Sequence, residues 1–234
     1  MKKRDFKVGF NGTSLTGDAF GATPPRLLFI HGAGSSDRKR FEQLRTLLAN
    51  KGIGSTSFDF IGHGETGGTL AGSSLESRVA QASAVIDMQE VSQPLSIVAS
   101  SMGGYVAIKL TAQYPVKDLI LVAPAVYDTK SYRLPFGAEF TKAIQNPFSW
   151  RNTDAWEILR RYQGNLLIYG AEKDQVIPQE IIEKLYESAR NARSREVIMI
   201  KDATHSLAKW IGERPDSLRE ISEKISGLSK PDAE

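Results

Sequence analysis

Short apolar runs alternate with longer amphipathic segments along most of this chain, and this alternation restricts the fold more than any other feature. The strand-like runs cover residues 26–30, 54–60, 95–100, 118–123, 165–169 and 196–200, and helix-like segments follow them at 39–50, 75–91, 105–114, 178–190 and 215–228. Continuous apolar runs are typical of strands buried on both faces, and a strand–helix–strand order produces a parallel sheet. The sequence therefore predicts an α/β fold: a mostly parallel sheet with helices on both faces.

Residues 127–162 break this pattern. The stretch is rich in aromatic residues, carries two prolines and fits no continuous strand. We expect one α/β domain over residues 1–234, a length that suits a single domain, with a short helical cap inserted at 127–162. Four aromatic residues of the insertion are candidates for lining an apolar substrate pocket: Phe136, Phe140, Phe148 and Trp150. The same rings would equally serve as the core of the insertion itself.

The composition excludes several kinds of site. The chain has no cysteine, which rules out disulfides, thiolate metal sites and a cysteine nucleophile, and its three histidines argue against a multi-histidine metal site. No phosphate-binding glycine motif occurs, so we expect no cofactor. The net charge of +3 comes without the aromatic interleaving of a nucleic-acid surface, and no apolar run is long enough to cross a membrane. We expect a cytoplasmic protein with a small-molecule partner, no nucleic acid and no membrane span. A homo-oligomer is left open.

A serine lies where the central apolar run turns into a helix. Such a strand–turn–helix with small residues two positions before and after the serine is typical of a nucleophile elbow, usually Gly-x-Ser-x-Gly. For Ser101 these flanking residues are Ala99 and Gly103, both small, whereas for Ser100 both are bulky. Ser101 is therefore the predicted nucleophile. Alanine in place of the first glycine is a mild departure from the pattern.

A serine hydroxyl needs a base to take its proton, and histidine suits this task near neutral pH. His31 and His63 lie in tight glycine-flanked loops, which indicates a role in shaping those loops. His205 follows the last predicted strand, and we predict that it is the base.

The base in turn needs a carboxylate that fixes its tautomer and stabilises the imidazolium. Asp174 follows a buried strand, so it can reach the far ring nitrogen of His205 from a separate strand end. Asp202 is the local rival, and Asp59 is a third candidate. The sequence favours Asp174.

Acyl transfer also needs donors for the oxyanion of the tetrahedral intermediate. The amide of Met102 follows the serine at a helix N-terminus, where the helix dipole adds to it. We expect the second donor from the glycine-rich loop after the first long strand, with the amide of Ala33 favoured and that of Gly34 as the alternative.

Together these motifs resemble the α/β-hydrolase family, over nearly the whole chain. In chain order they are His31-Gly32-Ala33-Gly34, residues 59–66, Ser101-Met102-Gly103-Gly104, residues 170–174 and His205. The order of serine, aspartate and histidine is that of the family. The resemblance implies the family fold and a triad of Ser101, Asp174 and His205. It is closest in kind to small serine esterases, thioesterases and acyl-glycerol lipases with short caps.

These observations predict a serine hydrolase that cleaves a carboxylic ester or thioester through an acyl-enzyme. Amide and carbon–carbon bond hydrolysis use the same triad and stay open. A non-catalytic small-molecule binding protein on the same fold is an alternative from another class.

Overall fold

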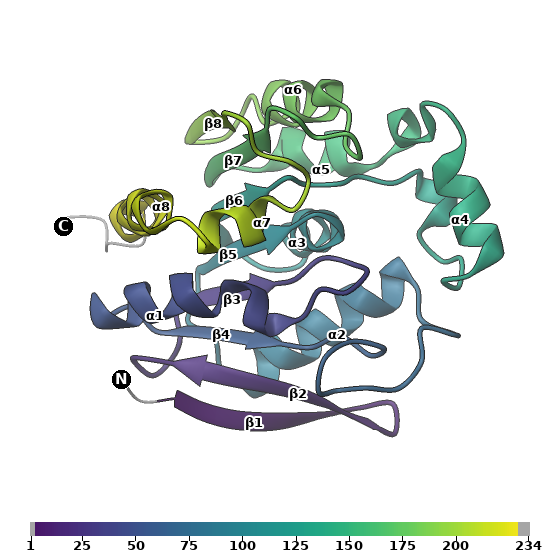
Figure 1. The fold of residues 1–234 in the computed structure, drawn as a ribbon. Helices are drawn as coiled ribbons and strands as arrows, with labels where there is room; N and C mark the ends of the chain where they lie inside the picture. Colours follow the sequence, from purple (N-terminus) through teal and green to yellow (C-terminus); the bar gives the residue numbers. More distant parts are fainter. Residues whose placement is uncertain (1–2, 229–234) are drawn as a thin grey trace.

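The computed structural model describes residues 3–228 and contains one eight-stranded sheet (Figure 1). Within that range its strands are β1 (Lys3–Phe10), β2 (Thr13–Phe20), β3 (Leu27–Ile30), β4 (Ser55–Phe58), β5 (Leu95–Ser100), β6 (Val116–Val122), β7 (Asn165–Ala171) and β8 (Ser194–Ile200). Their order across the sheet is β1-β2-β4-β3-β5-β6-β7-β8. The pairs β1–β2 and β2–β4 are antiparallel, and every other pair is parallel. The predicted mostly parallel sheet is therefore confirmed.

Helices connect most of the strands. They are the 3-10 turns η1 (Arg38–Phe41), η2 (Thr129–Ser131) and η3 (Ser149–Asn152), and the α-helices α1 (Glu42–Asn50), α2 (Leu75–Met88), α3 (Met102–Leu110), α4 (Ala138–Gln145), α5 (Ala155–Arg161), α6 (Gln179–Ser188), α7 (Leu207–Gly212) and α8 (Pro215–Leu228). The expected single domain also takes in residues 1–2 and 229–234, which lie outside the described residues.

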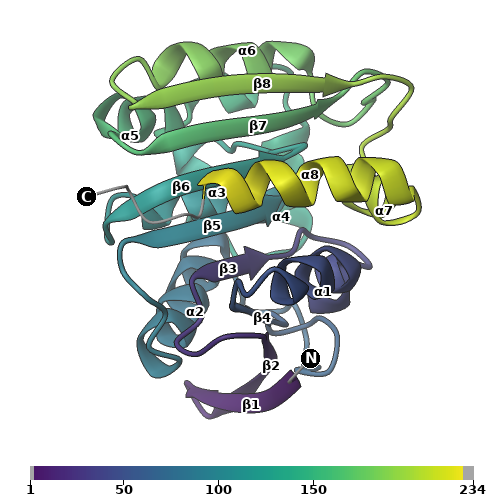
Figure 2. The ribbon, with the colours of Figure 1, turned by 90° about the vertical axis from the view of Figure 1, so that its left-hand side faces the viewer.

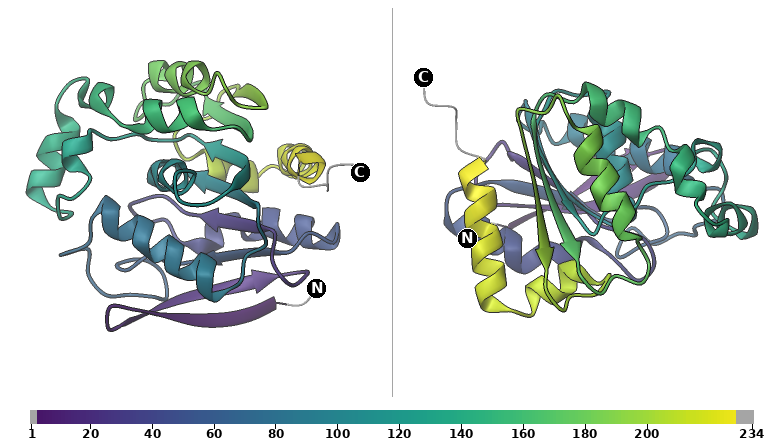
Figure 3. Two further views of the ribbon diagram at one scale, coloured as in Figure 1. Left: turned by 180° about the vertical axis from the view of Figure 1, so that it is seen from behind. Right: turned by 90° about the horizontal axis from the view of Figure 1, so that it is seen from above.

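Both faces of the sheet are buried. Successive side chains of each strand point to opposite faces, so each strand contributes to two cores. In β6, Leu119 and Leu121 pack in one apolar core, and Ile120 and Val122 pack in the other. The first core lies under α2, α3, α5 and α6, and the second lies under η1, α1, α7 and α8. Figures 2 and 3 show these two helical layers on opposite sides of the sheet. Helices on both faces, as expected from the sequence, are confirmed.

The aromatic insertion forms η2, α4 and η3 between β6 and α5. Helix α5 belongs to the layer of α3 and α6, whereas α4 stands beside α2 and α3, on the far side of the sheet from α1 and α8 (Figure 3). Backbone hydrogen bonds tie the insertion to the start of α2: the Phe136 amide donates to the Ser73 carbonyl at 2.7 Å, and the Glu76 amide to the Tyr132 carbonyl at 3.0 Å. The insertion is thus anchored on the α2 and α3 side of the molecule.

Candidate active site

Ser101 connects β5 to α3 through a strained turn. Its φ of 49° and ψ of −121° lie where residues with a side chain are rare, at a cost of about 1–3 kcal/mol that the surroundings must offset. Backbone hydrogen bonds hold the turn, since the Ser101 amide donates to the Val122 carbonyl at 3.1 Å and the Gly104 amide donates to the Ser101 carbonyl at 2.9 Å. A Cβ at Gly103 would lie only 2.6 Å from the His31 carbonyl oxygen. Glycine therefore lets α3 approach β3 and leaves the serine at the tip of the turn.

His205 lies directly against this serine. Its Nε2 is 3.0 Å from Ser101 Oγ, and its Nδ1 is 2.9 Å from Asp174 Oδ2. The three residues come from the ends of β5, β7 and β8, which meet at one edge because these strands are parallel. An Nδ1–H that donates to the carboxylate leaves the Nε2 lone pair facing the serine hydroxyl. The structure thus brings the predicted nucleophile, base and carboxylate into one hydrogen-bonded chain.

The carboxylate of Asp174 is held by its own loop as well as by His205. Oδ1 accepts hydrogen bonds from the Val176 amide at 2.8 Å and the Ile177 amide at 2.9 Å. Burial alone would raise the pKa of Asp174, but the hydrogen bonds from His205 and these amides outweigh burial and hold the pKa below its ordinary value. Asp174 is therefore an anion at neutral pH, pointed at the imidazole.

The other two carboxylates that the sequence offered lie elsewhere. Asp202 is exposed and forms an ion pair with Lys173, with Oδ1 2.5 Å from Nζ. Its amide donates to the Glu172 side chain at 2.8 Å, so it shapes its own turn. Asp59 is buried in a different set of ion pairs, with Arg38 as its partner. Neither carboxylate has a recorded hydrogen bond to His205.

The two amides predicted to bind an oxyanion flank the nucleophile. Met102 is the first residue of α3, so its amide has no acceptor in the helix. Ala33 lies in the exposed loop between β3 and η1, and that loop touches the serine through Gly32, where a Cβ would be 3.1 Å from Ser101 Cβ. Within residues 3–228 no hydrogen bond is recorded from the amide of Met102 or of Ala33. Both amides are free to donate to a ligand.

A pocket of about 240 Å³ opens at the serine. It is lined by Gly32, Ala33, Gly34, Ser35, Ser36, Arg40, Ser100, Ser101, Val122, His205, Ser206 and Ala208. Among the residues to which the sequence motifs did not point are Arg40, Val122 and Ala208. The strand order would have indicated Val122, because this residue ends β6 opposite Ser100 of β5. The pocket is small and polar, with Arg40 bordering it from η1.

The four aromatic residues expected in a substrate pocket do not line this one. Phe136 and Phe140 pack edge-to-face with ring centroids 4.8 Å apart, and Phe140 and Trp150 are buried in the core under α2 and α3. Phe148 is 57% exposed and stacks against Arg151. Within the insertion these rings pack in pairs, Phe136 against Phe140 and Phe148 against Trp150. Their part in substrate binding stays a prediction.

The remaining two histidines support the loops beside the serine. His31 is buried, donates from Nδ1 to the Gly32 carbonyl at 2.7 Å and accepts at Nε2 from the Phe60 amide at 3.2 Å. Burial, together with the neighbouring His63, lowers the pKa of His31 to about 3, so the ring stays neutral. Burial also lowers the pKa of His63, whose Nδ1 lies 3.2 Å from the Arg78 guanidinium. His31 thus links the loop after β3 to the loop after β4, and the centroid of its ring lies 5.0 Å from that of His63.

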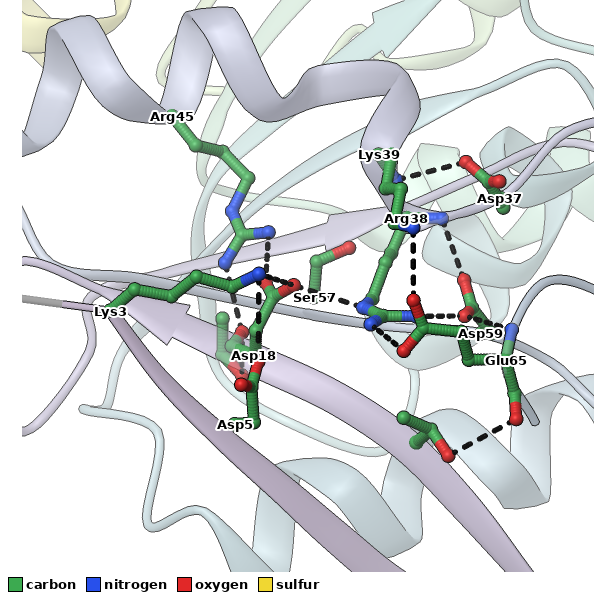
Figure 4. Close-up of polar contacts among 12 residues, drawn as sticks. Lys3, Asp5, Asp18, Asp37, Arg38, Lys39, Arg45, Ser57, Asp59 and Glu65 are labelled. Carbon is green, nitrogen blue, oxygen red and sulfur yellow. Dashed lines mark hydrogen bonds and ion pairs between the residues drawn. The ribbon is translucent and has the colours of Figure 1, made fainter.

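A cluster of buried charged side chains also connects η1 to the loop after β4 (Figure 4). The Arg38 side chain is 3% exposed and forms ion pairs with Asp18, Asp59 and Glu65. Arg45 of α1, equally buried, forms an ion pair with Asp18. The cluster joins β2, η1, α1 and the loop after β4, and it fixes the start of η1, which follows the predicted oxyanion loop directly.

No group of three or more His, Asp or Glu side chains within residues 3–228 is arranged to hold a metal ion. Over the same range, none of the helices has both the length and the apolar character needed to span a membrane.

Comparison with known proteins identifies the family. Residues 23–153, more than half of the chain, match the family model described as serine aminopeptidase, S33. The chain belongs to this family of α/β-hydrolases. A search of curated proteins finds no match.

Solved structures of other α/β-hydrolases superpose on nearly the whole chain. A CIB-like hydrolase from Thermoplasma acidophilum has a TM-score of 0.72 at 16% identity, covering 97% of this chain and 99% of that one. A monoacylglycerol lipase from Paleococcus ferrophilus has a TM-score of 0.71 at 19% identity, covering 92% and 99%. A thioesterase domain from the curacin biosynthetic pathway has a TM-score of 0.71 at 14% identity, covering 96% and 99%. Identities this low concern the fold alone, and the predicted α/β-hydrolase fold is confirmed.

Proposed function

We propose that this α/β-hydrolase is a serine hydrolase that cleaves a carboxylic ester or thioester. The observation that carries the proposal is the continuous chain from Ser101 Oγ to His205 Nε2 at 3.0 Å and from His205 Nδ1 to Asp174 Oδ2 at 2.9 Å. Distances in this range allow a proton to pass from the serine to the imidazole as the hydroxyl attacks. Two similar structures, described as a thioesterase domain and a monoacylglycerol lipase, support the same substrate class.

In the first half of the reaction, Ser101 Oγ forms a bond to the substrate carbonyl carbon while its proton moves to His205 Nε2. The anionic Asp174 stabilises the imidazolium that results. The carbonyl oxygen becomes an oxyanion, which accepts hydrogen bonds from the amides of Met102 and Ala33. The tetrahedral intermediate then collapses, and the alcohol or thiol leaves with the proton that His205 returns.

In the second half, water takes the place of the leaving group. His205 removes a proton from the water as its oxygen attacks the acyl carbon, and it returns that proton to Ser101 Oγ when the acyl-enzyme breaks. The side chain of His205 is 24% exposed, and the neighbouring loop at Ala33 is exposed, so water reaches the acyl carbon without movement of the fold. The product is a carboxylic acid.

The lining of the pocket favours an ester or thioester over a peptide with a free amino terminus. An aminopeptidase must hold a substrate ammonium beside the scissile bond, and a carboxylate suits that task. The pocket lining includes no Asp or Glu, and the permanently charged side chain among its residues is Arg40. A cation at this position repels an ammonium and is compatible with a neutral or anionic substrate.

Covalent labelling with a fluorophosphonate, followed by peptide mass mapping, tests the proposal. We expect one adduct, on Ser101, which is lost in Ser101→Ala, is strongly slowed in His205→Ala and is retained in the matched control Ser100→Ala. Panels of esters, thioesters and aminoacyl anilides then assign the substrate class, with hydrolysis of the first two expected. A folded protein that forms no adduct and hydrolyses no member of these panels would overturn the proposal and favour a binding protein on the same fold.

A further inference from the structure

A second cavity lies on the side of the sheet opposite the aromatic insertion. Its volume is about 300 Å³, and it lies between η1 and α1 on one side and α7 and α8 on the other. Strands β5 and β6 form its floor with Val98, Ile120 and Val122. Its apolar walls are Phe41, Leu44, Ile211, Leu218, Ile221 and Ile225. Polar residues such as Lys39, Lys209 and Glu213 are exposed and form its rim. An apolar cavity of this kind favours hydrocarbon over water.

This cavity adjoins the pocket at Ser101. Three residues line both spaces: Arg40, Val122 and Ala208. The Val122 carbonyl accepts the hydrogen bond of the Ser101 amide at 3.1 Å, so the floor of the cavity begins beside the nucleophile. Arg40 of η1 is half-buried between the two spaces. The two spaces therefore adjoin each other, with Arg40, Val122 and Ala208 at their boundary.

The position of the cavity decides which part of the substrate it receives. The leaving group must depart towards solvent after the first half of the reaction, and the loop at Ala33 and Ser35 leaves that side of the pocket exposed. The acyl group stays bonded to Ser101 until water attacks. A space walled by helices and adjoining the pocket suits the group that remains on the enzyme.

Building on the function proposed above, we propose that the cavity between α1 and α8 binds the acyl chain of the substrate, and that this chain is an aliphatic one of medium length. The volume of about 300 Å³ equals roughly ten units of about 30 Å³, the space that a water molecule, and approximately a methylene group, occupies. Chains of about six to ten carbons fill it. Phe140 and Trp150 of the insertion pack in the core on the opposite face of the sheet, away from this cavity.

A large side chain substituted at Gly212 would fill part of the cavity. This residue ends α7 and lines the cavity, and a Cβ built on it meets only the Gln43 Oε1 atom, at 3.8 Å. A phenylalanine at this position occupies the space meant for the chain. Gly227 of α8 provides the matched control, because a Cβ there meets nothing within 4 Å and the residue does not line the cavity. Ala208→Phe, at the boundary between the two spaces, is a second blocking variant in case Gly212→Phe folds poorly.

The experiment compares kcat/KM for 4-nitrophenyl acetate, butyrate, octanoate and palmitate. In the wild-type protein we expect a rise of about three- to four-fold for each added methylene up to octanoate, and a fall for palmitate. Gly212→Phe and Ala208→Phe should lower the ratio of octanoate to acetate by at least tenfold, whereas Gly227→Phe and the insertion variant Phe148→Ala keep the wild-type ratio. Equal ratios in the wild type and in both blocking variants would overturn the proposed site, as would a ratio that changes only in Phe148→Ala.

A binding measurement on Ser101→Ala separates this site from the proposed reaction. Octanoate should raise the Tm of Ser101→Ala and should leave the Tm of Ser101→Ala/Gly212→Phe unchanged. If esters are hydrolysed but neither binding nor chain preference depends on Gly212, the chain site is wrong and the proposed reaction stands. If octanoate binds in a Gly212-dependent way while no ester or thioester is hydrolysed, the site stands and the proposed reaction is wrong.

Discussion

Arg38 binds Asp59 through both its backbone and its side chain. The Arg38 amide donates to Asp59 Oδ1 at 2.8 Å, and the guanidinium forms an ion pair with Oδ2. The same guanidinium donates to Asp18 at 2.9 Å and to Glu65 at 2.6 Å. One buried cation thus holds three carboxylates and joins the start of η1 to β2 and to the loop that follows β4.

Removing this cation should strongly destabilise the fold. In Arg38→Met the buried carboxylates of Asp18 and Asp59 lose a partner, and we expect the free energy of unfolding to fall by about 3–5 kcal/mol. Urea denaturation measures the change. Arg161→Met removes an exposed pair with Glu157 on α5 and serves as the control, with an expected loss below about 1 kcal/mol. An equal loss of unfolding free energy in the two variants would contradict the prediction that the buried ion pairs of Arg38 stabilise the fold more than an exposed pair does.

The strained backbone of Ser101 predicts an unusual order of stabilities. With φ at 49°, glycine relieves strain that alanine retains, so Ser101→Gly should be more stable than Ser101→Ala by about 1 kcal/mol. At Ser100, which ends β5 in an extended conformation, the order should reverse because glycine weakens a strand. Thermal unfolding of the four variants tests both orders. A higher stability of Ser101→Ala than of Ser101→Gly would contradict the predicted strain.

The two rival carboxylates should differ sharply in their effect on activity. Asp174→Asn removes the anion that accepts the His205 Nδ1–H and favours the wrong tautomer, so kcat should fall by about 10⁴-fold. Asp202→Asn removes an exposed ion pair with Lys173 and should change kcat less than about twofold. Steady-state kinetics on a good ester measures both. A large loss in Asp202→Asn with a small one in Asp174→Asn would reassign the carboxylate.

His31 should make the fold sensitive to acid. Its pKa is about 3 in the folded state and 6.5 when unperturbed, so between these values the unfolded chain binds a proton that the folded protein does not. Stability from this group is complete above pH 6.5 and falls as the pH drops, by up to about 1.4 kcal/mol per pH unit. In His31→Gln the curve of unfolding free energy between pH 6.5 and 4 should be flatter than in the wild type. Parallel curves would show that His31 does not carry the dependence.

The strand ends were predictable from the sequence because they depend on local patterns. The apolar run before Ser101 and the small residues around it specify β5 and the turn into α3. Parallel strands then bring residues at their carboxyl ends together, which is why Asp174 and His205 were candidates without knowledge of the distances. The limits of α8, Pro215–Leu228, also coincide with the predicted helix.

Features that depend on distant partners were not predictable in this way. Arg45 lies in an amphipathic helix and would be assigned to its polar face, yet the side chain is 1% exposed because Asp18, 27 residues away, meets it in the core. Helix α7 has six residues, too few for a helical period to show in the sequence. The position of the insertion depends on hydrogen bonds that Tyr105 Oη and Lys109 Nζ of α3 donate to the Asp154 carboxylate, which no local pattern encodes.

The sheet order has a consequence for how the protein loses activity. His205 follows β8, which among residues 3–228 lies at one edge of the sheet beside β7, and several side chains of β8 are exposed. Edge elements of this kind open more readily than the centre of a sheet. Detachment of β8 alone would carry the imidazole away from a serine that stays in place between β5 and α3. Loss of activity in rising denaturant therefore reports on the attachment of one strand, and it should precede the cooperative unfolding of the central sheet.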